Sequence, residues 1–104
     1  MANRKLTLST IRRVASALPG MQEGTSYGTP AWHHKGRLLS RLHQDGKSLM
    51  LKVGFDACEH LVRADPETFF VTEHYRNYPS VLARLNRLSA ADLRKLLVRA
   101  VERG

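Results

Sequence analysis

Three histidines near the middle of the chain are the residues most suited to binding a metal ion. His33 and His34 are adjacent, and His43 ends the next expected strand. Because neighbouring side chains on a strand point to opposite faces, His33 and His34 do not easily share one ion. No Cys-x-x-Cys or His-Glu-x-x-His spacing accompanies them. We therefore expect no metal and no other cofactor, with the histidines facing solvent or a phosphate.

Cys58 is the residue most suited to nucleophilic catalysis. It is the single cysteine of the chain, so no internal disulfide can form, and a reducing cytoplasm is the simplest location. Cys58 and His60 are two apart on an expected helix, where that spacing turns side chains in different directions. Ser26, Glu73 and His74 are not part of any nucleophile-elbow pattern. We expect no catalytic residues and no enzymatic activity.

Positive charge is the clearest functional feature of the sequence. The net charge is +8, from 17 Lys and Arg against 9 Asp and Glu. Residues 31–53 carry five basic side chains against Asp45 alone, whereas residues 54–75 carry five acidic side chains against Arg63 alone. From Arg76 onward the chain is basic again. A fold that gathers the basic segments has one positive side, which favours an anionic partner.

Three helices are expected where apolar residues recur at helical spacing. The first covers 11–18, with Thr7 or Ser9 as its cap, and the second covers 56–64. The last begins after Ser89, which resembles the first residue of a capping box.

Five strands are expected between these helices. Glycine-rich residues 20–30 are interpreted as an ordered loop that precedes them. Turns are expected at Lys35-Gly36 and at Asp45-Gly46, because glycine adopts the positive φ that a hairpin turn requires. The expected strands are 31–35, 37–43, 47–53, 69–72 and 81–87.

The order α-β-β-β-α-β-β-α predicts an α+β fold, a two-layer α/β sandwich whose antiparallel sheet has helices on one face. A length of 104 residues suits one domain over 1–104. No apolar run approaches the length of a membrane span, and the basic N-terminus lacks the apolar stretch of a secretory signal. We expect a cytoplasmic protein that does not enter a membrane.

Several segments resemble the MmcQ/YjbR family of small bacterial proteins. They are Leu-Pro-Gly at 18–20, Glu-Gly-Thr-Ser-Tyr-Gly-Thr-Pro-Ala at 23–31, Gly-Phe-Asp at 54–56, and residues 37–41 and 70–82. The resemblance runs in order from about residue 10 to residue 100. It implies a two-layer α/β fold like that of secretion chaperones, and a DNA-binding role through a proposed paired-wing surface.

A basic sheet face is the expected contact for DNA. Strand alternation places Arg37, Leu39, Arg41 and His43 on one side of 37–43. Lys52 and Arg84 on neighbouring strands can join that side, with Lys35 and Lys47 in support at the turns. We expect a non-catalytic protein whose side chains contact DNA phosphates without strong sequence preference.

Apolar side chains on the same face leave an alternative open. Leu39, Met50 and Leu82 are expected among the basic residues, and a mixed surface of this kind equally suits a homodimer or another protein partner. The alternative function is therefore a protein-interaction or adaptor module.

Aromatic residues mark where a small-molecule pocket would form. We expect it among residues that lie in or just after the glycine-rich segment or cluster near residue 75. They are Tyr27, Trp32, His74, Tyr75 and Tyr78.

Overall fold

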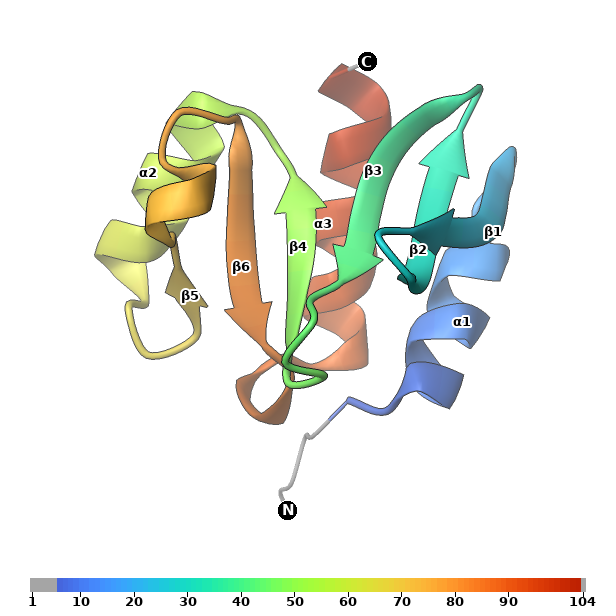
Figure 1. Cartoon of the computed structure of the whole chain (residues 1–104), viewed down its shortest axis with the longest axis horizontal. Helices are drawn as coiled ribbons and strands as arrows, with labels where there is room; N and C mark the ends of the chain where they lie inside the picture. The colour runs from blue at the N-terminus through green and yellow to red at the C-terminus, as the bar shows by residue number, and fades with distance from the viewer. Residues whose placement is uncertain (1–5, 104) are drawn as a thin grey trace.

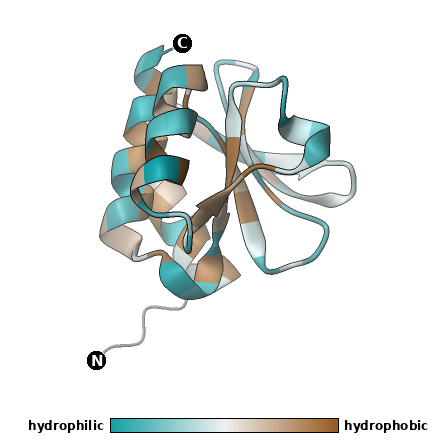
Figure 2. Cartoon of the chain, turned by 90° about the vertical axis from the view of Figure 1, so that its left-hand side faces the viewer, coloured by the Kyte–Doolittle hydropathy of each residue, from teal (hydrophilic) through white to brown (hydrophobic). Residues whose placement is uncertain are grey.

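Within residues 6–103, the part of the chain that the computed structural model describes, three helices lie on one face of a six-stranded sheet (Figure 1). The basic residues Arg4 and Lys5 lie outside this range. Figure 2, a side view, shows the helices in one layer and the sheet in another. The helices are α1 (Leu8–Ser16), α2 (Phe55–Ala64) and α3 (Ala90–Arg103), with short 3₁₀ turns η1 (Glu73–Tyr75) and η2 (Leu85–Arg87). None of the helices in this range is long and apolar enough to cross a membrane.

The sheet is antiparallel throughout and has the order β1-β2-β3-β4-β6-β5. This arrangement confirms the predicted two-layer α+β fold. The strands are β1 (Met21–Ser26), β2 (Thr29–His34), β3 (Arg37–Leu42), β4 (Ser48–Lys52), β5 (Phe69–Phe70) and β6 (Ser80–Arg84).

The helix caps follow the local sequence. The Thr7 side chain accepts a hydrogen bond from the Thr10 backbone N–H at 3.2 Å, so Thr7 rather than Ser9 is the cap of α1. The Ser89 hydroxyl accepts one from the Asp92 N–H at 3.1 Å, which confirms the predicted start of α3. The last predicted strand is too long, because the chain leaves the sheet after Arg84 and turns into η2.

Strand β1 is the main error in the predicted elements, since residues 20–30 were expected to form a loop. Met21–Ser26 pairs with β2 through a two-residue hairpin at Tyr27-Gly28. Tyr27 and Gly28 both have positive φ, 54° and 80°, as a hairpin turn of this length requires. The turn was not predicted, because tyrosine rarely adopts positive φ. The strand was not predicted, because it is an edge strand with no alternation of apolar side chains.

A bulge in β3 changes which side chains point toward the helices. Trp32 pairs with Ser40 and His33 with Leu38, so Leu39 is an extra residue between the two pairs. Leu39 is buried in the main core under the helices, while Leu38 packs on the other face. The predicted position of Leu39 beside Arg41 is therefore wrong.

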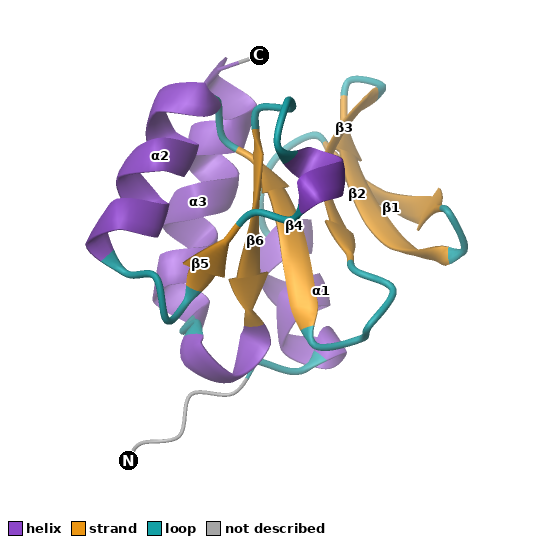
Figure 3. Cartoon of the chain, turned by 60° about the vertical axis from the view of Figure 1, so that its left-hand side comes forward, coloured by secondary structure: helices purple, strands orange, loops and turns teal. Residues whose placement is uncertain are grey.

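The sheet face opposite the helices, called here the second face, carries a small core of its own. Met50 and Leu82 pair in register on β4 and β6, and both are buried. Tyr75 of η1 packs over them, with Leu38 and Phe70 at the sides. Figure 3 shows η1 crossing in front of the sheet on this side. The apolar side chains expected to form an exposed interaction surface are thus covered by the chain itself.

Candidate functional site

The second face brings together some of the predicted basic residues and separates others. Arg41 pairs in register with Met50, while Lys52 and Arg84 lie at opposite ends of the β4–β6 pair. Side-chain alternation puts these three basic residues on the second face, as predicted. Arg37 is next to Leu38 and points the other way, because the bulge has shifted the alternation. Its predicted place beside Arg41 is wrong, although its side chain is exposed at the end of the hairpin.

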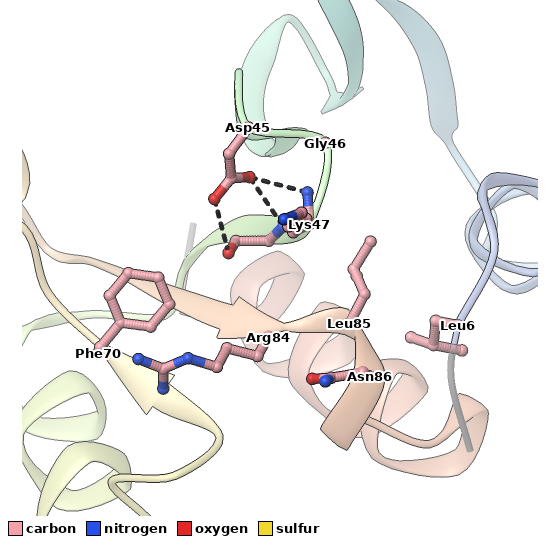
Figure 4. Close-up of a pocket in the computed structure, with 9 residues that line it drawn as sticks. Leu6, Asp45, Gly46, Lys47, Phe70, Arg84, Leu85 and Asn86 are labelled. Carbon is pink, nitrogen blue, oxygen red and sulfur yellow. Dashed lines mark hydrogen bonds between the residues drawn. The ribbon is translucent and has the colours of Figure 1, made fainter. Parts of the chain in front are cut away.

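Lys47 and Arg84 line one hollow at the end of the second face, of about 610 Å³ (Figure 4). The guanidinium carbon of Arg84 lies 4.3 Å from the centroid of the Phe70 ring. The same guanidinium donates to the backbone carbonyls of Glu67 at 3.1 Å and Pro66 at 3.3 Å. Asp45 also lines this hollow, and its carboxylate accepts from the backbone N–H of Lys47 at 2.8 Å and shapes the turn. This hollow therefore presents two cations, one of them held firmly in place.

Arg41 differs from the other basic residues because it is buried, with 3% of its surface exposed. Its Nη1 donates to the Tyr75 hydroxyl at 2.8 Å, and its Nε lies 3.5 Å from the Ser26 carbonyl oxygen. The Tyr27 ring covers it, with the ring centroid 5.2 Å from the guanidinium carbon. In the described part of the chain no carboxylate pairs with it, since the four ion pairs there join Arg12, Arg63, Arg76 and Arg87 to glutamates.

A cavity of about 260 Å³ opens beside this guanidinium. Three of its lining residues, Tyr27, His74 and Tyr75, belong to the predicted aromatic pocket. The others are Arg41, His43 and Gln44, of which Arg41 and His43 were expected only on a DNA-contacting surface. Nδ1 of His43 is buried and has no hydrogen-bond partner within residues 6–103.

Two of the predicted pocket residues lie elsewhere. Trp32 is 2% exposed and belongs to the main core, because its pairing with Ser40 places it on the helix side of the sheet. Tyr78 has its ring centroid 6.3 Å from that of Tyr75 but lines a different hollow, with Phe55 and Val71.

The histidines do not converge on a metal site. The His33 ring lies against Gly24 and the His34 ring against Gly20, on opposite faces of β2. Within residues 6–103, no group of three or more His, Cys, Asp or Glu side chains is placed to hold a metal ion.

Cys58 is expected to react slowly with alkylating reagents. Burial raises the pKa of its thiol from 9.0 to about 11, although a hydrogen bond with the Val53 backbone and the Arg103 charge act in the opposite direction. The thiolate is the nucleophile, so at pH 8 the alkylation rate should be about 100-fold below that of a thiol with the unshifted pKa. Iodoacetamide labelling followed by mass spectrometry measures this rate, with the protein in denaturant as the fast control. Equal rates in the folded and denatured protein would contradict the burial of the Cys58 thiol.

Comparison with known proteins supports the fold. No family model and no curated protein matches the sequence. Among solved structures, the chain is similar to Deinococcus radiodurans protein DR2400, whose family-model domain is DUF419. The TM-score is 0.75 at 25% sequence identity, over 93% of this chain and 77% of the other. DUF419 is the MmcQ/YjbR-like family, so this likeness agrees with the resemblance drawn from the sequence.

Proposed function

We propose that the chain is a member of the MmcQ/YjbR family that binds DNA in the bacterial cytoplasm without catalysing a reaction. Lys47, Lys52 and Arg84 on and beside the second face would contact the phosphates. Lys35, Arg37 and His43 would support them at the margins. Arg41 is too deeply buried to reach a duplex directly, so we leave it out of this contact.

The observation that carries this proposal is that the basic side chains proposed as contacts form no ion pairs with other residues of 6–103. None of the proposed contacts pairs with a carboxylate within residues 6–103. The neighbouring Asp45 is engaged by backbone N–H groups and by the Ser48 hydroxyl. The positive charge of this face is therefore left to act on a partner.

The spacing of the cations suits phosphates better than base edges. Lys47 and Lys52 lie at the two ends of β4, about 17 Å apart at the usual rise per residue of a strand. Side chains at that distance reach different phosphates. Phosphate contacts position a protein on DNA but do not read its sequence, so we propose binding with little sequence preference.

The proposal predicts binding that weakens steeply with salt. If about four phosphates are contacted, affinity should fall roughly 100-fold between 50 and 200 mM salt, because bound counterions are released. The double variant Lys47→Glu/Lys52→Glu should reduce the slope of log affinity against log salt by about 2. Fluorescence anisotropy with a labelled duplex measures both quantities.

A matched control exists on the helix layer. Arg94→Glu/Lys95→Glu changes the net charge equally but at two exposed positions of α3. It should leave the slope nearly unchanged. The proposal fails if the duplex does not bind at 50 mM salt, or if both double variants weaken binding equally.

A second candidate function, protein interaction, is favoured by a different set of residues from those first expected. Phe55, Tyr78 and Val71 are 58%, 54% and 39% exposed, respectively, and line one hollow beside α2. A contiguous exposed apolar surface suits a protein partner or a second copy of the chain. If two copies of the chain associate through this hollow, Phe55→Ser should shift the sedimentation profile from dimer to monomer. A wild-type chain that stays monomeric at all concentrations would exclude the dimer.

A further inference from the structure

We infer that the cavity beside Arg41 binds a small molecule through an oxyanion, either a carboxylate or a phosphate group. The inference does not depend on DNA binding, because the main proposed DNA contacts, Lys47, Lys52 and Arg84, lie outside this cavity and only the supporting residue His43 lines it. It rests on the charge, the hydrogen-bonding groups and the size of the cavity.

The positive charge of the buried Arg41 side chain favours an anionic partner. A guanidinium stays protonated in proteins, and burying it is unfavourable unless a partner compensates the charge. The protein supplies one tyrosine hydroxyl and one backbone carbonyl at 3.5 Å, and no carboxylate within residues 6–103. Of the five N–H groups of the guanidinium, three have no acceptor in this part of the chain.

The other groups around the cavity are polar and include groups that can donate hydrogen bonds. The Tyr75 hydroxyl accepts from Arg41, which leaves its own proton free to donate. Nδ1 of His43 is buried without a partner among residues 6–103, and the Gln44 side chain adds an amide. No Asp or Glu of the described residues lines the cavity. A site with several donors, one fixed positive charge and no acid selects an anion over a cation.

Size and shape restrict the ligand further. A volume of about 260 Å³ lies below the range of about 300–1,000 Å³ typical of drug-sized ligands, so the ligand must be compact. The planar guanidinium matches a carboxylate or phosphate through two parallel hydrogen bonds. The Tyr27 ring, 79% exposed, stands over Arg41 at the mouth of the cavity. A flat group attached to the oxyanion could stack on that ring.

Thermal unfolding with two simple probes tests the inference. Sodium phosphate and sodium benzoate represent the two oxyanions, and sodium chloride at equal ionic strength is the reference. At about tenfold its Kd, a bound probe should raise the Tm of the wild-type chain by roughly 7 °C. A response to benzoate alone assigns a carboxylate ligand, and a response to phosphate alone assigns a phosphate ligand.

Matched variants separate the cavity from general ionic effects. Arg41→Gln should abolish the rise in Tm, whereas Lys95→Gln removes the same charge at an exposed position of α3, outside the cavity, and should preserve it. No rise with either probe, or an equal rise in wild type and Arg41→Gln, would overturn the inference.

A measurement on the wild-type chain covers the case in which Arg41→Gln does not fold. Titration of the more effective probe, followed by amide chemical shifts, should perturb Arg41, His43, His74 and Tyr75 first. Perturbation confined to α3 and the lysines would overturn the inference.

Discussion

Replacing Trp32 with alanine is expected to lower the free energy of unfolding by about 3–5 kcal/mol, the usual effect of truncating a large buried aromatic side chain. Trp32 is among the largest fully buried residues and belongs to the main core under the helices, as do Leu39 and Leu51. Since a domain of this size is stable by about 5–15 kcal/mol, the variant should lose a large share of its stability.

Chemical denaturation followed by circular dichroism measures this change. The control is Tyr78→Ala, which truncates a half-exposed aromatic residue that the sequence placed in the same pocket. It should change stability by less than about 1 kcal/mol. If Trp32→Ala were nearly neutral for stability but weakened oxyanion binding, Trp32 would belong to the cavity as first predicted.

The elements with strong local signals could be predicted from the sequence. Apolar residues at helical spacing and hydroxyl caps gave the positions of α1 and α3. The turns at Lys35-Gly36 and Asp45-Gly46 follow from glycines that have positive φ in the structure. These signals are local, so the elements they mark can be predicted without knowledge of the tertiary contacts.

The edge strand and the bulge could not be predicted, for different physical reasons. Strand β1 is stabilised by hydrogen bonds to β2 rather than by an apolar face, so its sequence does not distinguish it from a loop. The bulge at Leu39 depends on a mismatch of register between two strands. A single extra residue then exchanges the faces of Leu38 and Leu39, an effect that strict alternation cannot anticipate.

The sequence predicted which face of the sheet carries the basic residues of the candidate site. It did not predict that Arg41 is buried there. Alternation correctly placed Arg41 and Lys52 on the same face. The burial of Arg41 comes from Tyr75, which is 34 residues away in the sequence. The segment that carries Tyr75 has no regular periodicity, so nothing local indicates that it crosses the sheet. The burial of the Arg41 guanidinium by aromatic side chains therefore depends on tertiary contacts.

Arg41 also provides the second large expected effect, an increase in stability. In buffer without phosphate or carboxylate, the double variant Arg41→Met/Tyr75→Phe should raise the free energy of unfolding by about 1–3 kcal/mol, as replacement of buried charges by apolar groups often does. Methionine keeps the apolar stem, and phenylalanine keeps the ring that covers Met50 and Leu82. Removing both members of the 2.8 Å hydrogen bond leaves neither partner unsatisfied.

Urea denaturation of the wild type and the double variant measures the change in the free energy of unfolding. Arg84→Met is the control on the same face of the sheet. The Arg84 guanidinium is half-buried and already held by two carbonyls and the Phe70 ring, so its loss should be neutral or destabilising by up to about 1 kcal/mol.

A double variant less stable than the wild type would mean that the buried guanidinium is structural, which would remove the charge argument for an oxyanion site. A double variant that is more stable and also loses the response to phosphate and benzoate would show that the chain retains Arg41 for binding at the expense of stability.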